Sequence, residues 1–451
     1  MLKRLRRAFK RHANPSRKQE PHIILAAQHS IAPQDISRGA AEVVQTLEQA
    51  GFSAFVVGGC VRDLLLGLHP KDFDVATNAT PEQIKDLFRR ARIIGRRFRI
   101  VHVRFGPEVV EVTTFRAHHG TVKSRTSKDH AKRGANGMLL RDNVFGSIDD
   151  DAARRDFTIN ALYYHPTDNT IYDYANGLVD IENRVLRVIG DPLTRYREDP
   201  VRMLRAARFC ARLDFQLDPE STAIIPPSAE LLAAVSPARL FDETLKLFMA
   251  GYAAATWKKL EQLGLAEQLF PATAPLLENN GFYQRFIDQA LHNTDERIHQ
   301  DKRVTPAFLF AALLWPAVCE TQTNLENNGR PRAQARQQAI GKVIAAQVKR
   351  IAIPRRFTLP MREIWDLQGH FFRRGGQQAQ RLLAHPRFRA AYDFILLREQ
   401  SGEELDGLGE WWTRFQEADN AGQEAMIDAL GSRKQGRGRR PRVRKTRANA
   451  N

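Results

Sequence analysis

Cysteine is scarce in this sequence, with only Cys60, Cys210 and Cys319 among 451 residues. Their odd number and wide spacing argue against a disulfide framework or a cysteine zinc site, and indicate a reducing, cytoplasmic compartment. No run of about 18 apolar residues occurs, so no membrane span is expected. The N-terminus is basic but has no apolar segment of the kind that marks a secretory signal. No internal repeat is present, which argues against a solenoid.

Acidic residues are absent from both ends of the chain. Residues 1–18 hold eight Lys or Arg and residues 431–451 hold nine, without one Asp or Glu. Without these seventeen, 52 basic residues balance 51 acidic ones, so the net charge of +18 lies almost entirely on the two ends. Such ends neutralise phosphates in a salt-dependent way. The alternative for the C-terminal end is a solvated, disordered segment with no partner.

The periodicity of apolar residues changes near residue 200. Before it, helices and strands alternate as in a small mixed α/β unit, whereas after it only helical patterns appear. A polar, basic stretch over 117–138 is predicted to be a mobile loop. In the first part we predict helices over 36–51 and 61–68, strands over 53–57, 73–77, 98–105 and 109–115, and a helix beginning at 80. Residues 152–164 are predicted to form either a helix or a helix-to-strand junction. In the second part we predict helices over 201–213, 238–247, 256–263, 306–314 and 340–351.

The most informative segment combines a glycine turn with two carboxylates. Gly58 and Gly59 follow a predicted strand and let main-chain N–H groups approach an anion closely. Asp72 and Asp74 lie two positions apart, so on a strand they share one face. Paired carboxylates are hard oxygen ligands that suit Mg²⁺ together with substrate phosphates. The alternatives are an ordinary turn and two solvated acids at a strand edge.

Further charged residues extend this pattern. Glu111 alternates with Val110 and Val112, so it faces away from them, either as a third acid beside the pair or as a solvent-facing residue. Asp199 precedes Arg202 by about one helical turn and offers acceptor and donor groups for a base edge. The alternative is a helix start with ordinary ion pairs.

Four motifs in this order resemble the class II nucleotidyltransferases, a group that contains the tRNA CCA-adding enzymes and the bacterial poly(A) polymerases. They are Gly58-Gly59-Cys-Val-Arg62-Asp63, Asp72-Phe-Asp74, Arg-Arg155-Asp156 and Glu-Asp199-x-x-Arg202-x-x-Arg205. The segment 93–103 is similar to the poly(A) polymerase branch. The resemblance covers nearly the whole chain and is less specific after residue 205.

The resemblance implies roles for individual residues. Asp72 and Asp74 would bind two Mg²⁺ ions, with Asp156 as a further catalytic acid. The strand alternation, and not the resemblance, adds Glu111 as a candidate third ligand. The implied nucleotide-binding residues are Gly58, Gly59, Arg62, Asp63, Arg155, Asp199, Arg202 and Arg205. For RNA binding we expect Arg97, Arg99, Arg439 and Arg440.

The implied reaction is template-independent transfer of AMP from ATP to RNA 3′ ends. One Mg²⁺ would activate the 3′-hydroxyl, while the second ion and Arg62 would neutralise the leaving pyrophosphate. The alternative is a CCA-adding enzyme, which shares the catalytic head. We expect a monomer whose partners are RNA, ATP, RNA-decay proteins and an RNA chaperone.

The expected fold is α+β, with a mixed-sheet nucleotidyltransferase head, an all-α neck and body, and a disordered basic tail. The predicted domains are a basic extension (1–35), the head (36–165), a base-recognition and RNA-binding neck (166–237), an RNA-binding helical body (238–430) and the tail (431–451).

Overall fold

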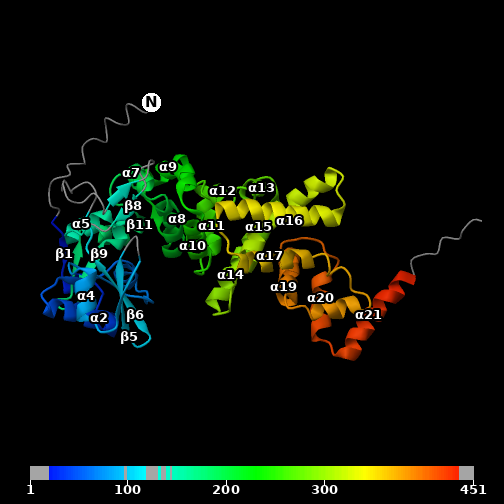
Figure 1. Cartoon of the computed structure of the whole chain (residues 1–451), viewed down its shortest axis with the longest axis horizontal. Helices are drawn as coiled ribbons and strands as arrows, with labels where there is room; N and C mark the ends of the chain where they lie inside the picture. Colours follow the sequence, from blue (N-terminus) through cyan, green and yellow to red (C-terminus); the bar gives the residue numbers. More distant parts are fainter. Residues whose placement is uncertain (1–19, 96–98, 118–130, 134–138, 143–144, 436–451) are drawn as a thin grey trace, which may run out of the picture. The chain divides into compact units, whose positions relative to one another are not determined.

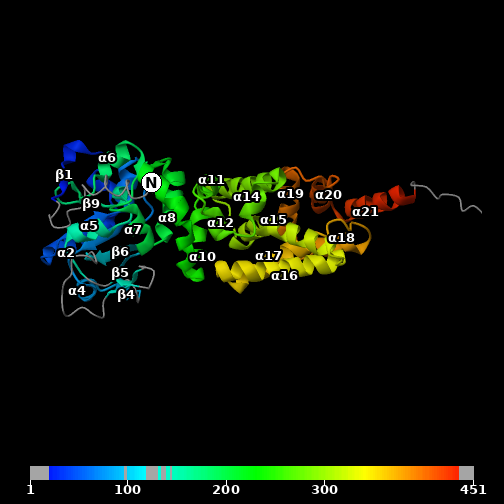
Figure 2. The same cartoon turned by 90° about the horizontal axis from the view of Figure 1, so that it is seen from above.

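The computed structural model describes residues 20–95, 99–117, 131–133, 139–142 and 145–435 (Figures 1 and 2). The chain divides into two compact units. The first comprises Met1–Val235 and Gln262–Leu265, and the second comprises Ser236–Glu261 and Ala266–Asn451. The predicted α+β architecture is confirmed, because the first unit is built on a mixed sheet and the second is all helical within the described residues.

An eight-stranded sheet forms the centre of the first unit. Its strands β3 and β6 pair in parallel, and all other neighbours pair antiparallel. In sheet order the strands are β1 (His22–Ile24), β10 (Thr170–Asp173), β9 (Leu162–His165), β2 (Ala54–Val57), β3 (Asp74–Thr77), β6 (Glu108–Thr114), β5 (Ile100–Phe105) and β4 (Ala91–Ile94).

Two helices cover one face of this sheet. α2 (Arg38–Gln49) begins at a Ser37 cap and buries an apolar stripe against β2, β3, β5 and β6, and α4 (Pro81–Leu87) packs beside it (Figure 1). Val110 and Val112 of β6 are fully buried on this side. The exposed Glu111 between them therefore lies on the opposite face, as the alternation predicted.

Shorter elements join the sheet to the helices that end the first unit. They are α3 (Gly59–Leu65), α5 (Ile148–Arg154), η3 (Thr158–Asn160), α6 (Gly177–Glu182), β11 (Val185–Leu186), α7 (Pro192–Glu198), α8 (Val201–Leu213), β12 (Gln216–Leu217), α9 (Pro219–Ser228) and η4 (Ala229–Ala234). Short 3₁₀ turns, η1 (Ala26–Gln28) and η2 (Pro33–Asp35), precede α2.

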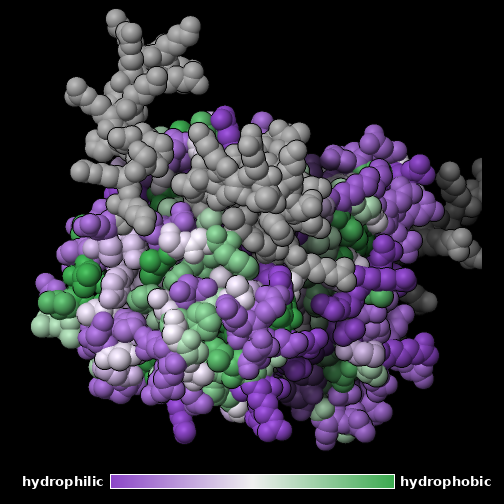
Figure 3. Space-filling view, turned by 60° about the vertical axis from the view of Figure 1, so that its left-hand side comes forward, coloured by the Kyte–Doolittle hydropathy of each residue, from purple (hydrophilic) through white to green (hydrophobic). Residues whose placement is uncertain are grey.

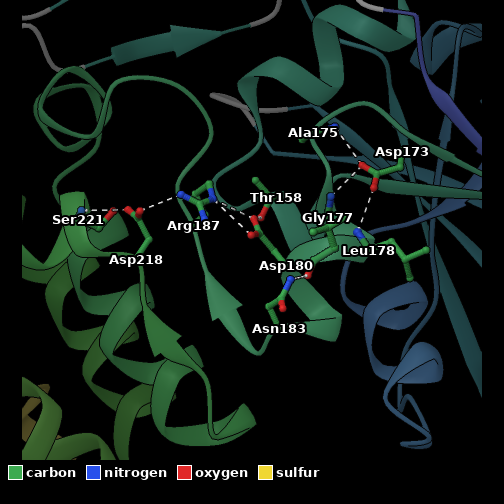
Figure 4. A network of polar contacts seen from close by, with 11 residues as sticks. Thr158, Asp173, Ala175, Gly177, Leu178, Asp180, Asn183, Arg187, Asp218 and Ser221 are labelled. Atoms are coloured by element: carbon green, nitrogen blue, oxygen red, sulfur yellow. Dashed lines mark hydrogen bonds and ion pairs between the residues drawn. The ribbon is translucent and has the colours of Figure 1, made fainter. Parts of the chain in front are cut away.

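A polar network in which the exposed Arg187 binds two buried carboxylates connects these elements (Figure 4). The Arg187 guanidinium donates to Asp218, the N-cap of α9, at 2.9 Å and to Asp180 of α6 at 3.2 Å. Asp180 also accepts from the Thr158 hydroxyl at 2.7 Å. Paired and hydrogen-bonded in this way, the buried carboxylates of Asp180 and Asp218 hold the turn at Thr158 in place.

The second unit is a stack of helices. They are α10 (Pro237–Phe248), α11 (Ala253–Gln262), α12 (Ala266–Leu269), α13 (Ala274–Leu277), α14 (Gly281–His299), α15 (Pro306–Asn327), α16 (Arg332–Arg350), α17 (Arg355–Leu367), α18 (Gln377–Leu383), α19 (Phe388–Gln400), α20 (Leu408–Glu417) and α21 (Asn420–Gln435). Figure 2 shows α16 and α17 alongside α15, which is apolar around its whole circumference and nearly all buried over 306–318.

Indole groups organise the second core. Trp365 donates from Nε1 to the Ala311 main-chain oxygen at 3.1 Å, and Trp412 donates to that of Phe371 at 3.0 Å. Both side chains are fully buried. Each bond satisfies the polar atom of a large apolar side chain.

Several predicted elements need correction. The loop predicted over 117–138 is wrong for β7 (Ala131–Arg133), which pairs antiparallel with β8 (Leu139–Asp142). These short strands lack the alternation of apolar and polar residues that would reveal them. Residues 118 and 119, a histidine pair, lie outside the described residues. The predicted tail begins at 431, but α21 continues to Gln435.

One face of the molecule is drawn by hydropathy in Figure 3. The face drawn in Figure 3 is mostly hydrophilic, with apolar residues in small groups between polar ones. None of the helices in the described part of the chain combines the length and apolarity needed to span a bilayer.

Candidate active site

The turn after β2 brings the two glycines against a buried cation. Gly58 has φ +84° and ψ −131°, a conformation that L-residues rarely adopt. A Cβ atom at Gly58 would lie 3.2 Å from Nη1 of Arg155, so the guanidinium packs directly on the main chain. Gly59 follows as the first residue of α3. The structure therefore places Gly58, Gly59 and Arg155 together.

The carboxylate pair lies at the adjoining end of β3, but only one member is in the strand. β3 begins at Asp74, which pairs with Val57, the last residue of β2. Because β2 ends there, Phe73 has no partner on that side, and the prediction of a strand from residue 73 is wrong. Asp72 lies exposed two residues before the strand, whereas Asp74 is half-buried.

Glu111 lies beside this pair. It is the direct neighbour of Asp74 across the parallel pair β3–β6, so both side chains project from the same face of the sheet. Its carboxylate lies 3.1 Å from Nε2 of His102 on β5. Within the described residues, no three His, Cys, Asp or Glu side chains gather closely enough to hold a metal ion by themselves. A cation here would need ligands from a substrate as well.

The electrostatics of Asp74 reflect crowding of negative charge. Burial, followed by the neighbouring Glu111, raises the pKa of Asp74 to about 6, with Asp72 adding to the effect and Arg155 opposing it. These carboxylates repel one another, and a bound cation would relieve that repulsion.

Several buried hydrogen bonds and an ion pair hold the Asp156 carboxylate in place. Its Oδ1 accepts from the Phe157 main-chain N–H at 2.9 Å and from Nδ2 of Asn160 at 3.1 Å, and its Oδ2 pairs with Arg205 at 2.9 Å. Burial works to raise the pKa of Asp156, but Arg205, Asn160 and Arg202 outweigh it and hold that pKa below its usual value. Asp156 is therefore ionised at neutral pH.

The side chains of Arg62 and Asp63 both form hydrogen bonds and ion pairs with other residues of the protein. Nη1 of Arg62 donates to Oδ1 of Asn160 at 2.6 Å, Nε donates to Asp63 at 2.8 Å, and the guanidinium lies over the Phe209 ring. Asp63 also pairs with Arg212 of α8 at 2.8 Å. Arg62 is only 2% exposed. This placement favours support of the turn over direct contact with a nucleotide.

Arg155 is held in the same way. Its Nε donates to the Tyr163 hydroxyl at 2.9 Å, and its Nη2 pairs with Asp151 at 3.1 Å. Although burial alone would lower it, Tyr163 and Asp151 raise the pKa of Arg155 above its usual value. This fixed positive charge lies against the Gly58 turn and is close enough to Asp74 to oppose the rise in its pKa.

The second cluster begins where α7 ends. Asp199 is the C-cap of α7 and is partly exposed. Its main-chain oxygen accepts from the N–H of Arg202 at 3.0 Å, which starts α8. Arg202 is buried and donates from Nη1 to the Arg195 main-chain oxygen at 2.8 Å. Because Arg205 pairs with Asp156, this cluster and the Asp156 loop are joined.

The predicted RNA-binding residues are mostly outside the described residues, namely Arg97, Arg439 and Arg440. Arg99 precedes β5 and does not lie on it, because that strand begins at Ile100. Its guanidinium bonds to exposed Glu82 of α4. The role of these four residues stays a prediction.

Sequence reasoning missed three side chains that build the site. Asn160 follows the motif that ends at Asp156 by four residues, but its bonds to Arg62 and Asp156 depend on contacts up to 98 residues apart. No pattern in the sequence pointed to Arg212. The spacing did point to Arg195, because it lies three residues before Glu198 on one helix face, with their charged groups 2.8 Å apart.

Three protein-family models match this chain. Their descriptions are poly A polymerase head domain, for residues 54–187, probable RNA and SrmB-binding site of polymerase A, for 214–277, and polymerase A arginine-rich C-terminus, for 328–447. Together they match the head, the following helices and the C-terminal part.

Individual relatives differ in how much they cover. The chain is 49% identical over 429 residues to poly(A) polymerase I of Escherichia coli O6:H1, which spans 94% of this chain and 92% of that protein. It is 41% identical over 213 residues to the CCA-adding enzyme of Lactobacillus helveticus, but this spans only 47% of the chain and 50% of that protein.

Among solved structures, the Bacillus stearothermophilus CCA-adding enzyme in complex with CTP is similar with a TM-score of 0.55 and 24% identity, covering 90% of this chain and 82% of that one. At this identity the similarity shows a common fold.

Proposed function

Since this chain belongs to the poly(A) polymerase family, whose members match it over nearly its full length, we propose that it adds AMP from ATP to RNA 3′ ends without a template. The 3′-oxygen of the RNA forms a bond to the α-phosphorus of ATP, and the bond from that phosphorus to the pyrophosphate oxygen breaks. The chain would thus act as a polynucleotide adenylyltransferase.

The observation that carries the proposal is the crowding of carboxylates at the start of β3. Asp74 has a pKa raised to about 6 by burial, Glu111 and Asp72, with Arg155 as the opposing charge. Hard oxygen ligands that repel one another fit a divalent cation such as Mg²⁺ completed by substrate phosphates. Asp72 and Asp74 would hold it, with Glu111 as a third candidate ligand. When bound, such ions activate the attacking hydroxyl and neutralise the leaving pyrophosphate.

The nucleotide would lie between the Gly58 turn and the start of α8. Gly58 and Gly59 leave room for close main-chain contact, and Arg155 supplies a fixed positive charge next to them. We assign base recognition to Asp199 and Arg202, which present an acceptor and donors. The ion pair between Arg205 and Asp156 would support Asp199 and Arg202 in their positions. Arg62 and Asp63 would support the turn from within, since both are buried in internal bonds.

RNA is the proposed partner of the rest of the chain. The match to an RNA-binding model over 214–277 and the basic end with Arg439 and Arg440 support this assignment. Arg97 and Arg99 are proposed to contact phosphates near the site. A role in RNA decay, with decay proteins and an RNA chaperone as partners, is part of the same proposal.

The test is AMP transfer by carboxylate variants. Asp72→Asn and Asp74→Asn should each lower single-turnover transfer to an RNA primer by at least about 1,000-fold, because a ligand to catalytic ions is lost. Asp86→Asn, at an exposed acid of α4, is the matched control and should transfer normally. A folded Asp74→Asn protein that transfers AMP at the normal rate would refute the assignment.

The alternative is a CCA-adding enzyme. It is supported less well, because the CCA-adding relative spans 47% of this chain while the poly(A) polymerase spans 94%. The two differ in nucleotide choice and product length, which a primer-extension assay separates.

A further inference from the structure

Arg195 joins two parts of the site that the sequence motifs present separately. It lies on α7, and its Nη2 donates to the main-chain oxygens of Arg154 and Arg155, each at 2.6 Å. Its Nη1 donates to Oε2 of Glu198 at 2.8 Å. With the side chain only 5% exposed, these three charge-assisted bonds are shielded from water.

The two carbonyl groups are ones that a helix leaves without an intrahelical partner. α5 ends at Arg154, and Arg155 is its C-cap in an extended conformation. The last carbonyls of a helix need donors from elsewhere, and a cation there also opposes the negative end of the helix dipole. Arg195 meets both needs directly before Asp156, so it fixes where the chain leaves α5.

The same arginine also holds Arg202. The main-chain oxygen of Arg195 accepts from Nη1 of Arg202 at 2.8 Å. Oε2 of Glu198, which binds Arg195, lies 3.6 Å from that Nη1. Arg202 therefore binds residue 195 through a main-chain carbonyl, which any side chain there would keep, and is linked to the Arg195 side chain through the shared Glu198 carboxylate.

The Arg195 charge is stable at neutral pH. Burial and the neighbouring Arg202 lower the pKa of Arg195 to about 10, with Glu198 as the main opposing charge, so the guanidinium keeps its proton. Two buried cations next to one carboxylate are costly unless the main-chain acceptors are present. The carbonyl groups of Arg154 and Arg155 therefore stabilise the buried Arg195 guanidinium that in turn positions them.

We propose that Arg195 is a positioning residue that sets the placement of Arg202 relative to Asp156 and thereby the preference for ATP over CTP. It touches no nucleotide itself in this assignment. The inference rests on the proposed function, because it needs Arg202 to recognise the base. It adds a residue outside the four motifs to the group that determines nucleotide choice.

The experiment compares Arg195→Lys and Arg195→Gln with Arg197→Lys and Arg197→Gln. Arg197 is exposed on the same helix and is the matched control. For each full-length variant, kcat and KM are measured with ATP alone and CTP alone on one RNA primer, together with the unfolding temperature. Lysine keeps the charge but cannot reach two carbonyls and Glu198 in a fork.

We expect Arg195→Lys to lower kcat/KM for ATP by about 10–100-fold, with most of the loss in kcat, because misplacement of the reacting groups is the cause. The ratio of kcat/KM for ATP to that for CTP should fall about 10-fold. The Arg197 variants should stay within about 2-fold of the parent.

A folded Arg195→Lys protein with the parental ATP-to-CTP ratio would overturn the proposal, whatever its stability. Should Arg195→Gln not fold, Glu198→Gln gives an independent reading, since it removes the shared negative charge with little change in volume. It is expected to lower the ratio too, and an unchanged ratio again counts against the proposal. If instead the parent protein adds no AMP from ATP, the proposed function fails before the role of Arg195 is at issue.

Discussion

The two units of this protein bury different kinds of side chain. In the described part of the first unit, eleven charged side chains are buried, among them Arg62, Asp156 and Arg202. In the described part of the second, only Glu243 and Arg398 are. Buried charges cost stability unless each is paired, whereas apolar burial stabilises directly. The first unit therefore accepts a less favourable interior in order to hold charged groups in place. Substitutions of these groups should alter the chemistry and also lower stability wherever they leave a buried partner unpaired.

The largest effect on stability is expected from the second unit. Trp412→Ala removes a fully buried indole that packs against Phe371, Phe388 and Phe415 and bonds to a main-chain oxygen. It should lower the free energy of unfolding by about 3–5 kcal/mol, measured by denaturant titration. Trp411→Ala, at a partly buried neighbour, should cost clearly less. KM for ATP in the folded Trp412→Ala protein should match the parent, and a strong rise would contradict the division of roles.

Arg202→Ala should show the opposite pattern. Loss of the proposed donor to the base should reduce the preference for ATP over CTP by about 10–100-fold, since discrimination depends on that hydrogen bond. Competition between the two nucleotides on one primer gives this ratio. Because Arg202 also lies near Asp156 and Glu198, some loss of stability is expected. Unchanged discrimination in a folded variant would remove Arg202 from base recognition.

Substitution of Asp74 should have a smaller effect, on the pH dependence of the stability of the folded protein. Its pKa in the folded protein, about 6, is above the ordinary value of 3.8. Between these values the folded state holds a proton that the unfolded state has released, so stability falls as pH rises from about 4 to 6 and stays lower above that. Asp74→Asn removes the ionisation.

In a chelator, Asp74→Asn should therefore be more stable than the parent at pH 7.5, on the order of 1–3 kcal/mol, and about equal at pH 4. Thermal unfolding at both pH values tests this, with Asp86→Asn as the exposed control. Addition of Mg²⁺ should stabilise the parent more than the variant. Equal stability of parent and variant at pH 7.5 would contradict the view that crowding of carboxylates destabilises this edge.

Removal of residues 431–451 should have the smallest effect on the catalytic step. It takes away nine basic residues and no acid. RNA affinity should weaken, and the slope of log affinity against log salt should flatten by several units, because fewer counterions are released. The kcat with saturating primer should not change. An unaltered salt slope would mean that this end does not touch RNA.

Secondary structure was predicted most accurately from the sequence where a local residue pattern alone determines the element. The helix over 201–213 and the strand near 53–57 appear as α8 and β2, since apolar spacing and the glycine turn define them. The short strands β1 and β10 were missed, because three or four residues carry too little periodicity. The start of β3 was wrong because it depends on where β2 ends.

The candidate site shows the same limit. The motifs name Asp74, Asp156 and Arg202. In the structure Arg205 connects Asp156 to the helix that carries Arg202, while Asp74 lies beside Glu111 on the sheet. The internal bonds of Arg62 and the link through Asn160 were not visible, since they join residues far apart in the chain. The spacing of Arg195 and Glu198 indicated an ion pair on one helix face, but the two main-chain oxygens that Arg195 also binds could not be read from any residue pattern.

The most direct measurement is primer extension with ATP or CTP, singly and together, on a generic RNA and on a tRNA that lacks its 3′ end. The account predicts long tails on the generic RNA with ATP alone. Addition that stops after two C and one A, and only on the tRNA, would contradict it and identify a CCA-adding enzyme.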